Sequence, residues 1–479
     1  MTAPVAIHDR AAGLATKACT VNPLKMSQPL GAALAFLGIA GSMPLFHGSQ
    51  GCTAFGLVLF VRHFRESIPL QTTAMNEVTT ILGGGENIEK ALLNIHKRAK
   101  PAFIGIASTG LTETKGDDVA GDLRLIKGAH PELDMPIVYV STPDYQGAFQ
   151  DGWAKAVTAI IEALAVPAPT VKGQVTILPG CHMTPGDIVE LRDIVTDFGL
   201  SPIVLPDLSG SLDGHVPEDF SPTSLGGTTV TEIGQIGASE ATIAVGEQMR
   251  PAARVLTEKT GVPAKVFDSL TGLAAADELY AYLSALSGRP VPDKYRRQRS
   301  QLVDAMLDAH FFFGGKRVAI GAEPDLLWAL GSWCKDMGCE LAAAVTTTES
   351  PVLARLAAEG VRLGDLEDLE AQAGGCDLLI THSHGRQAAH RLGISFLRMG
   401  LPVFDRLGAA HHVIVGYKGT RDLVFKVGNI FLANGHEWQP SDEAFDVLQN
   451  RRHGPAAGDA ACAGVGLPHH STRETEKSP

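Results

Sequence analysis

A single cysteine in a glycine-containing loop is the most informative chemical feature of the sequence. The loop reads His47-Gly-Ser-Gln-Gly-Cys52 and precedes an apolar stretch of helical character, residues 53–64. Gly48 and Gly51 allow tight turns and let backbone N–H groups approach a bulky anionic ligand. A cysteine at a loop-to-helix junction lies near the positive end of the helix dipole, which favours the metal-ligating thiolate. Cys52 is therefore a candidate iron–sulfur ligand, with the Gly51 backbone as a second candidate contact.

The motif alone leaves a simpler interpretation open. One cysteine in a glycine loop is more often a small buried residue, and a cluster generally needs several thiolates. The other cysteines show neither ligand spacing nor a disulfide framework, which fits a reducing compartment. They stand at positions 19, 181, 334, 339, 376 and 462.

Other segments carry reactive residue types without a complete site. Residues 82–89 are glycine-rich but lack the G-x-G-x-x-G spacing and a P-loop lysine, so they predict a helix-entry turn and no nucleotide binding. His382 and His384 could form a metal pair if extended, but no third ligand is near in sequence, which favours a structural role. The pair at 411–412 is interpreted in the same way.

No catalytic residue is predicted. Cys181 has His182 as its neighbour, but adjacent residues at a turn usually point apart, so a nucleophile with its base is disfavoured. Asp117 and Asp118 predict a helix cap. A self-sufficient enzyme using Cys181 or the histidine pair 382/384 remains an alternative, which activity without a partner chain would support.

These residues must be positioned by alternating strands and helices. Thr184 and Pro185 predict a helix start, and 293–313 predicts a long helix. Strands are predicted at 102–108, 137–141, 174–179, 203–206, 317–321, 340–346, 377–381 and 402–404. Such alternation implies βαβ units, parallel sheets and ligands at the carboxyl ends of strands. The predicted fold class is α/β, with three Rossmann-like domains whose mostly parallel sheets are flanked by helices.

The length of 479 residues agrees with about three domains at roughly 150 residues each. The strand–helix rhythm restarts near Val171 and Lys316. The predicted divisions are an N-terminal extension (1–23), an α/β domain with the Cys52 loop (24–167), two further α/β domains (168–297 and 298–436) and a C-terminal segment (437–479), disordered from about 451.

Composition excludes several classes of protein. The formal charge of −12 argues against nucleic-acid binding, which needs clustered Lys and Arg. Apolar residues at 45% indicate a globular core. Residues 1–17 lack a secretory pattern, and the apolar stretch 30–46 is interrupted by Gly and Pro, so neither a signal nor a membrane span is predicted. The expected location is the cytoplasm.

Five segments closely resemble the nitrogenase beta subunit and its cofactor-assembly paralogue, both of the nitrogenase component 1 family. The resemblance covers roughly residues 20–436 and implies that family's fold. The matching segments are Val21-Asn-Pro-Leu-Lys-Met-Ser-Gln-Pro-Leu-Gly-Ala32, His47-Gly-Ser-Gln-Gly-Cys52, Ser108-Thr-Gly-Leu-Thr-Glu-Thr-Lys-Gly-Asp-Asp118, Gly393-Ile-Ser-Phe-Leu-Arg-Met-Gly-Leu-Pro-Val-Phe-Asp-Arg-Leu-Gly408 and Gly416-Tyr-Lys-Gly-Thr-Arg421.

Differences from the family's cysteine pattern distinguish the catalytic beta subunit from the cofactor-assembly subunit. In the catalytic beta subunit, three cysteines of the N-terminal motifs ligate an interfacial cluster. The matching positions here are Ser27, Cys52 and Gly110, so two of the three thiolates are missing. Serine is a poor iron–sulfur ligand and glycine has no side chain. The pattern is similar to the beta-like subunit of the iron–molybdenum (FeMo) cofactor scaffold, in which one beta-side cysteine joins cysteines of the alpha-like subunit around a 4Fe-4S cluster.

The resemblance also implies the partners. An alpha-like subunit of the NifE type would form an α2β2 heterotetramer and hold most of the FeMo cofactor precursor. The nitrogenase iron protein and a NifB-like precursor donor would dock on this complex, which inserts molybdenum and homocitrate and acts as a scaffold rather than a conventional enzyme. Three related alternatives stay open: the catalytic beta subunit, a vanadium-system scaffold, and a subunit of dark-operative protochlorophyllide reductase.

Overall fold

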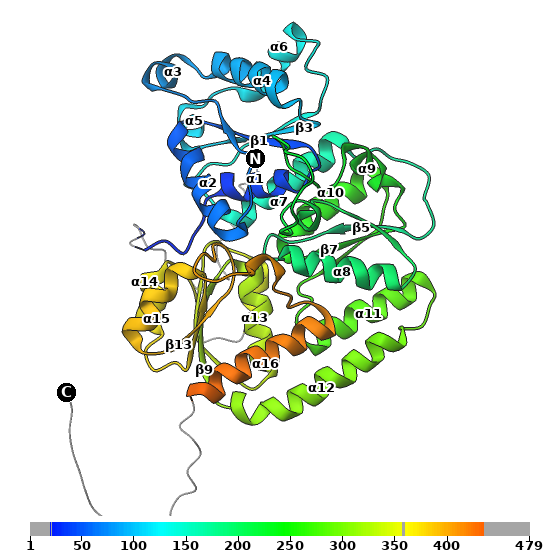
Figure 1. The fold of residues 1–479 in the computed structure, drawn as a ribbon, viewed down its shortest axis with the longest axis vertical. Coiled ribbons are helices and arrows are strands. Elements are labelled where there is room, and N and C mark those ends of the chain that lie inside the picture. Colours follow the sequence, from blue (N-terminus) through cyan, green and yellow to red (C-terminus); the bar gives the residue numbers. More distant parts are fainter. Residues whose placement is uncertain (1–19, 21, 357–359, 435–479) are drawn as a thin grey trace, which may run out of the picture. The chain divides into compact units, whose positions relative to one another are not determined.

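Strands and helices alternate along the chain, which confirms the predicted α/β class (Figure 1). The structure, a computed structural model, describes residues 20, 22–356 and 360–434. Most of the predicted N-terminal extension and all of the predicted C-terminal segment 437–479, including Cys462, lie outside the described residues.

The first sheet carries the Cys52 loop at its carboxyl edge. Its strands are all parallel, in the order β2-β1-β3-β4. Their bounds are Ser42–His47 (β1), Gln71–Thr72 (β2), Phe103–Ser108 (β3) and Ile137–Val140 (β4). β1 and β3 are buried throughout because helices cover both faces of the sheet. The covering pairs are α1 (Gln28–Leu37) with α7 (Phe149–Leu164), and α4 (Gly85–Ala99) with α6 (Val119–Ala129).

Two further parallel sheets follow along the chain, in the orders β6-β5-β7-β8 and β11-β10-β9-β12-β13. Their strands are Gln174–Leu178 (β5), Ser201–Val204 (β6), Ala241–Val245 (β7), Ala264–Phe267 (β8), Arg317–Ala322 (β9), Glu340–Thr346 (β10), Val361–Leu363 (β11), Leu378–Thr381 (β12) and Ser395–Arg398 (β13). The remaining α-helices are Gln50–Phe64 (α2), Glu77–Leu82 (α3), Gly110–Lys115 (α5), Pro185–Asp197 (α8), Val230–Gln235 (α9), Arg250–Thr260 (α10), Leu273–Ser287 (α11), Asp293–Phe313 (α12), Pro324–Asp336 (α13), Leu366–Gln372 (α14), Arg386–Leu392 (α15) and Gly416–Asn434 (α16).

One sheet lies within each of the three predicted α/β segments, while the boundaries near 168 and 298 stay predictions. The first and third segments share core contacts, because Leu24 packs with Ala319 and Leu379 of the third sheet. None of the described helices is long and apolar enough to span a membrane.

Several predicted elements have the observed bounds, including strand 340–346 and helix 293–313. Thr184 caps α8 as predicted, accepting from the Asp187 backbone N–H at 3.0 Å. The strand predicted at 402–404 is wrong. Its Val403 and Phe404 N–H groups donate to the side chains of His63 and Ser383 instead of a neighbouring strand.

Two glycines allow α1 and α7 to pack backbone against backbone. A Cβ added at Gly31, in the first family-like segment, would lie 1.8 Å from the Phe149 carbonyl oxygen. A Cβ at Gly152 would lie 1.9 Å from the Gln28 carbonyl oxygen. Both contacts are with backbone atoms, which side-chain rotation cannot relieve. The pair therefore fixes how α1, and the loop that follows it, lies on the first sheet.

We expect Gly152→Ala to lower the free energy of unfolding by about 3 kcal/mol, because the new methyl group must push the two helices apart. Urea denaturation of the purified chain measures this change. Gly128→Ala on α6 is the matched control, since a Cβ there meets nothing within 4 Å. That control should be neutral or stabilising by up to about 1 kcal/mol. Equal stability of the two variants would contradict the packing argument.

Candidate metal centre

Cys52 lies in the first turn of α2, where the backbone N–H groups of the helix end gather positive charge. Its side chain is half-buried, and its Sγ lies 3.7 Å from the Oγ of Ser49, the residue that precedes the helix. The thiol is therefore accessible from outside the chain at the N-terminal end of a helix.

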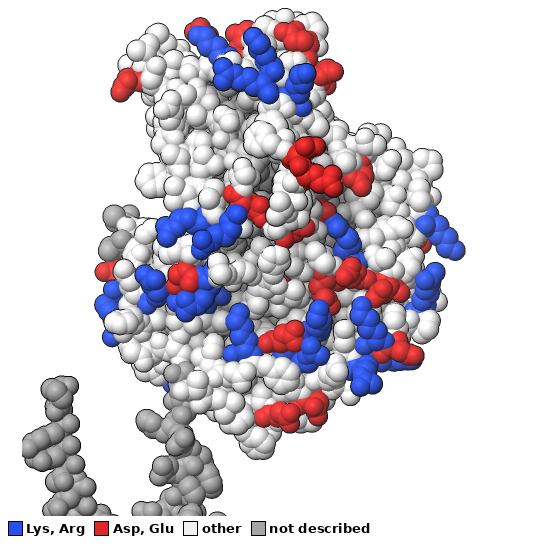
Figure 2. Space-filling model, viewed as in Figure 1, with Lys and Arg blue, Asp and Glu red and all other residues white. Residues whose placement is uncertain are grey.

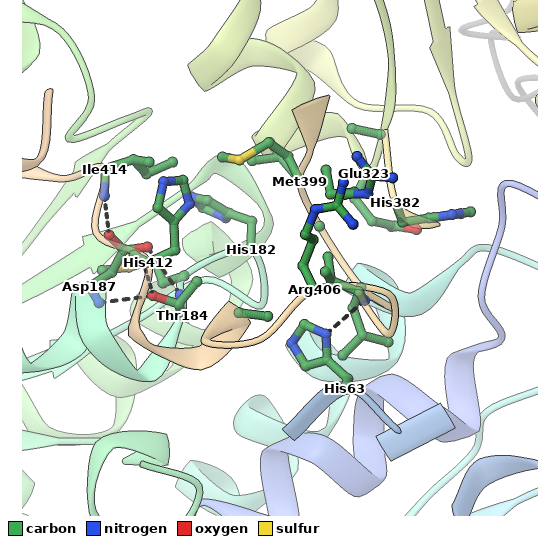
Figure 3. A pocket seen from close by; sticks show the side chains of 18 of the residues that line it. His63, His182, Thr184, Asp187, Glu323, His382, Met399, Arg406, His412 and Ile414 are labelled. Atoms are coloured by element: carbon green, nitrogen blue, oxygen red, sulfur yellow. Dashed lines mark hydrogen bonds between the residues drawn. The ribbon is translucent and has the colours of Figure 1, made fainter. Parts of the chain in front are cut away.

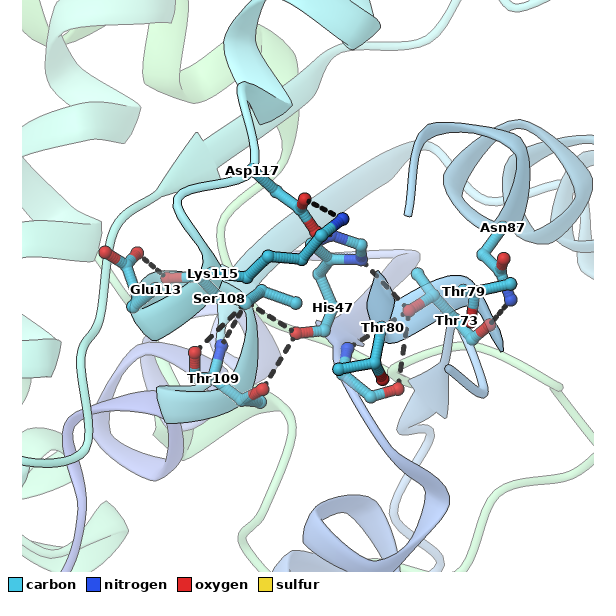
Figure 4. Close-up of polar contacts among 12 residues, drawn as sticks. His47, Thr73, Thr79, Thr80, Asn87, Ser108, Thr109, Glu113, Lys115 and Asp117 are labelled. Carbon is cyan, nitrogen blue, oxygen red and sulfur yellow. Dashed lines mark hydrogen bonds and ion pairs between the residues drawn. The ribbon is translucent and has the colours of Figure 1, made fainter. Parts of the chain in front are cut away.

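The backbone before Cys52 is held from two sides (Figure 4). On one side, the His47 carbonyl accepts from the hydroxyls of Thr109 and Thr112 at 3.0 and 3.2 Å. On the other, the Gly48 N–H donates to Thr73 Oγ1 at 3.1 Å, and the Gly48 carbonyl accepts from the Met75 N–H at 2.9 Å. The end of β1 is thus fixed between the segments that follow β2 and β3.

The two loop glycines have different roles. A Cβ at Gly48 would lie 2.2 Å from Thr109 Oγ1, so this position requires glycine. A Cβ at Gly51 would meet only Ser49 Oγ, at 3.9 Å, and Gly51 is exposed. The described residues therefore leave open space beside Gly51, the residue before Cys52. A backbone contact of Gly51 with a cluster stays a prediction.

A buried His47 side chain supports the loop from beneath. Its Nε2 lies 3.4 Å from Asp117 Oδ2, and Asp117 also pairs with Lys115 at 2.7 Å. Burial lowers the pKa of His47, while the nearby Asp117 carboxylate opposes that shift. Gly84 packs directly on the ring, where a Cβ would lie 2.4 Å from Cε1. The glycine-rich segment 82–89 thus serves as the predicted entry to a helix, α4.

The structure corrects one part of the predicted cap at 117–118. Asp118 does cap α6, accepting from the Gly121 N–H at 2.9 Å. Asp117 instead turns toward His47 and Lys115. Its carboxylate belongs to the support of the Cys52 loop.

The other two positions that the family resemblance pairs with cysteines meet at one carboxylate, Asp144. Its Oδ2 accepts from the Gly110 N–H at 2.9 Å, and the Ser27 hydroxyl donates to the same carboxylate. Burial raises the pKa of Asp144, opposed by these bonds and by Lys25. A Cβ at Gly110 would lie 3.1 Å from Oδ2. The space beside Gly110 is therefore occupied by Asp144, which the sequence analysis did not single out.

The described chain cannot complete a metal site alone. Among residues 22–356 and 360–434, no three His, Cys, Asp or Glu side chains are grouped so that they could hold a metal ion. Cys52 fits one corner of an iron–sulfur cluster, since it is an accessible sulfur at a helix N-terminus. Any cluster held by Cys52 therefore requires ligands from outside the described residues.

The other sequence candidates lie elsewhere. His382 is buried and precedes a 3₁₀ turn, Ser383–Gly385, rather than an extended segment. Its ring meets the His384 ring edge to face at 5.1 Å, which is a packing contact. Cys181 is buried, and burial raises its pKa well above the ordinary value, so the thiol stays protonated at neutral pH. Neither arrangement resembles an activated nucleophile or a metal pair.

An exposed apolar stripe continues from Cys52 along α2. Phe55, Val58 and Val61 follow at three-residue spacing, so they lie along one side of the helix. Ile81 and Leu82 at the end of α3 are also exposed. The area over α2 carries few charged side chains (Figure 2). Grouped exposed apolar side chains of this kind mark interaction surfaces.

Comparison with known proteins defines the class. Residues 27–432 match the family model of nitrogenase component 1 type oxidoreductases. A solved structure of nitrogenase Cp1 at pH 6.5 superposes with a TM-score of 0.83 at 32% identity, covering 90% of this chain and 97% of that one. The chain belongs to the nitrogenase component 1 family.

Within that family, the chain is similar to proteins named nitrogenase iron-molybdenum cofactor biosynthesis protein NifN. The NifN of Bradyrhizobium diazoefficiens is 60% identical, over 88% of this chain and 92% of its own length. The NifN of Nostoc is 52% identical, over 88% of this chain and 95% of its own length.

We expect His382→Gln to weaken the dependence of stability on pH between about 6.5 and 4. The His382 Nε2 lies 3.0 Å from the Leu24 carbonyl oxygen, so this nitrogen carries the proton, and burial lowers the pKa of the ring to about 4. The unfolded chain gains a proton near pH 6.5, whereas the folded chain does so only near pH 4. The histidine's stabilisation is therefore complete above 6.5 and is lost as pH falls.

Urea denaturation at several pH values tests this expectation. The free-energy difference between the wild-type chain and His382→Gln should shrink on acidification by up to about 1.4 kcal/mol per pH unit. The substitution His390→Gln on α15, at an exposed histidine, is the control and should leave the pH dependence unchanged. A constant difference between wild type and His382→Gln would show that the His382 ring titrates normally.

Proposed function

We propose that this chain is the beta-like subunit of a NifEN-type scaffold on which the FeMo cofactor precursor is matured. The named NifN relatives and the family membership support a role in cofactor biosynthesis for nitrogen fixation. The observation that carries the assignment is the single half-exposed thiol of Cys52, which no other potential ligand of the described chain accompanies. A chain with one such thiol can provide one ligand of a metal site that a second chain completes.

In this proposal Cys52 contributes one ligand to a 4Fe-4S cluster at the seam with an alpha-like subunit. Such a cluster, when bound, stores and passes single electrons. The chain's own part is positional: the bonds at His47 and Gly48 hold the start of α2, and Gly51 leaves the thiol accessible. The partner supplies the remaining cysteines, so cluster binding and subunit association stabilise one another.

The partner in this proposal is a NifE-like alpha subunit, in an α2β2 heterotetramer that works in the cytoplasm. The exposed stripe on α2 supports a protein interface next to Cys52. The precursor would be held mainly by the alpha-like subunit while molybdenum and homocitrate are inserted. The nitrogenase iron protein and a NifB-like precursor donor would act on the complex rather than on this chain alone.

The related alternatives are less well supported. A catalytic nitrogenase beta subunit would need further cluster ligands at 27 and 110, where Ser27 and Gly110 instead bind Asp144. The relatives at 50–60% identity carry the NifN name, which does not favour a protochlorophyllide reductase or a vanadium-system subunit.

Cys52→Ala should lower the iron content of the copurified complex, because the 4Fe-4S cluster loses one of its ligands. Iron quantification and the electron paramagnetic resonance spectrum of the reduced complex measure the loss. Cys376→Ala is the control, since Cys376 is buried and lies just before β12, away from the α2 loop. Unchanged iron and an unchanged spectrum in Cys52→Ala, with the complex still assembled, would defeat the proposed ligand role.

Phe55→Asp should reduce copurification with the alpha-like subunit by tenfold or more, because the carboxylate would be buried without a counter-charge. Phe55 is 76% exposed, so the substitution should hardly affect the stability of the chain itself. Leu125→Asp on α6 is the matched control, at 75% exposure but away from α2. If both variants retain the partner equally, the stripe on α2 is not the interface.

A further inference from the structure

The acid Asp144 lies at the same sheet edge as the Cys52 loop, although it follows a different strand. β1 and β3 are neighbours whose last residues are in register, His47 beside Ser108. Asp144 comes from the segment after β4, on the far side of β3, and its carboxylate accepts from the Gly110 N–H at 2.9 Å. Neighbouring strands are about 4.8 Å apart, so the starts of α2 and α5 lie close together at this edge.

A direct contact joins the segments that start these two helices. Thr109, the last residue before α5, donates its hydroxyl to the His47 carbonyl at 3.0 Å (Figure 4). A Cβ at Gly48 would lie 2.2 Å from the same hydroxyl oxygen. Cys52 follows within the first turn of α2. A charge on Asp144 therefore acts at the Cys52 end of α2, because charges interact over roughly 10 Å at moderate salt and farther where solvent is excluded.

The Asp144 carboxylate keeps its negative charge. The Gly110 N–H and the Ser27 hydroxyl donate to it, and neither neutral donor cancels that charge. Burial raises the pKa of Asp144, while these bonds and the nearby Lys25 oppose the shift and keep the group ionised at pH 7. The side chain is half-buried, so solvent screens its charge less than it would at an exposed position.

Lys25 is the cation that acts on Asp144. The same ammonium group also acts on Glu323, which lines a cavity of about 590 Å³ (Figure 3). Burial raises the pKa of Glu323 to about 8, so this carboxyl group is protonated at pH 7. The charge of Lys25 is therefore balanced by Asp144 rather than by Glu323. Removing either Asp144 or Lys25 leaves the charge of the other uncompensated.

We propose that Asp144 lowers the reduction potential of the metal centre to which Cys52 contributes a ligand. This inference rests on the proposed function, because it requires the 4Fe-4S cluster at the subunit seam. Reduction adds one electron to such a cluster, and a fixed negative charge nearby makes that addition less favourable. Lys25 has the opposite effect. Asp144 acts through its charge and is not a ligand, since its carboxylate is engaged by Gly110 and Ser27.

Potentiometric titration of the copurified complex at pH 7, followed by electron paramagnetic resonance, tests the proposal. The complex is prepared without the precursor donor, so that the seam cluster gives the signal, and dithionite supplies the electrons. Asp144→Asn keeps the shape and an acceptor oxygen of the side chain but removes its charge. At the wild-type midpoint potential, the ratio of reduced to oxidised cluster should rise about tenfold, which is about 59 mV for a one-electron couple.

Two further variants separate the charge of Asp144 from its structural role. Lys25→Gln removes the opposing charge, so the ratio of reduced to oxidised cluster should fall. Asp134→Asn is the matched control, because Asp134 is exposed and precedes β4 by three residues, at the opposite edge of the same sheet. It should leave the ratio unchanged. The iron content of all three variants should equal that of the wild-type complex, because no ligand is removed.

An unchanged midpoint potential in an iron-replete Asp144→Asn complex would overturn this inference and leave the role of Cys52 intact. The same holds for an equal shift in Asp134→Asn, for a shift of the same sign in Lys25→Gln, and for iron loss in Asp144→Asn as large as in Cys52→Ala. An iron-free wild-type complex would instead overturn the proposed function, and this inference with it.

Discussion

The position of the Cys52 thiol depends on how the end of β1 is held between its two neighbouring strands. In a parallel sheet the strands end at one edge, so the segments after β2 and β3 can reach the same two peptide groups, those of His47 and Gly48. Threonine hydroxyls from both sides bind these groups. The contacts are too close for any side chain at Gly48. The start of α2 is therefore held in place, whereas Gly51 is exposed and has open space beside it.

Ser27 and Gly110, which stand where the catalytic beta subunit has cysteines, both contact Asp144. Two missing thiolates could have left an empty polar space, but a single carboxylate accepts hydrogen bonds from both positions. This arrangement satisfies the Gly110 N–H, which would otherwise be a half-buried donor without a partner. A metal cluster spread over all three positions would have to displace Asp144. These three positions thus offer one thiol rather than three, in agreement with the proposal of a single cluster ligand on this chain.

Sequence patterns predicted the fold class and many of the strands, because alternating apolar strands and capped helices are local signals. The strand β1 was missed, although its end positions the site. Its run Ser42–His47 contains Pro44 and begins with a serine, so it lacks the β-branched pattern of β5 or β10. The two-residue β2 has no detectable period. Cys52 was singled out as a candidate from its motif, but Asp144 could not be, because only tertiary structure brings a residue of the β4–α7 loop to Ser27 and Gly110.

The misplaced strand at 402–404 illustrates the same limit of local sequence patterns. Pro402, Val403 and Phe404 form an apolar run that a local pattern cannot distinguish from a strand. In the folded chain the N–H groups of Val403 and Phe404 donate to His63 from α2 and to Ser383 from the segment after β12. The segment therefore connects helix α2 of the first sheet to the third sheet. Cys52, by contrast, is half-buried in the first turn of α2, and no group of potential metal ligands among the described residues includes it. A metal centre at Cys52 would therefore need ligands from outside the described residues, whereas the contacts of the 402–404 segment are complete within them.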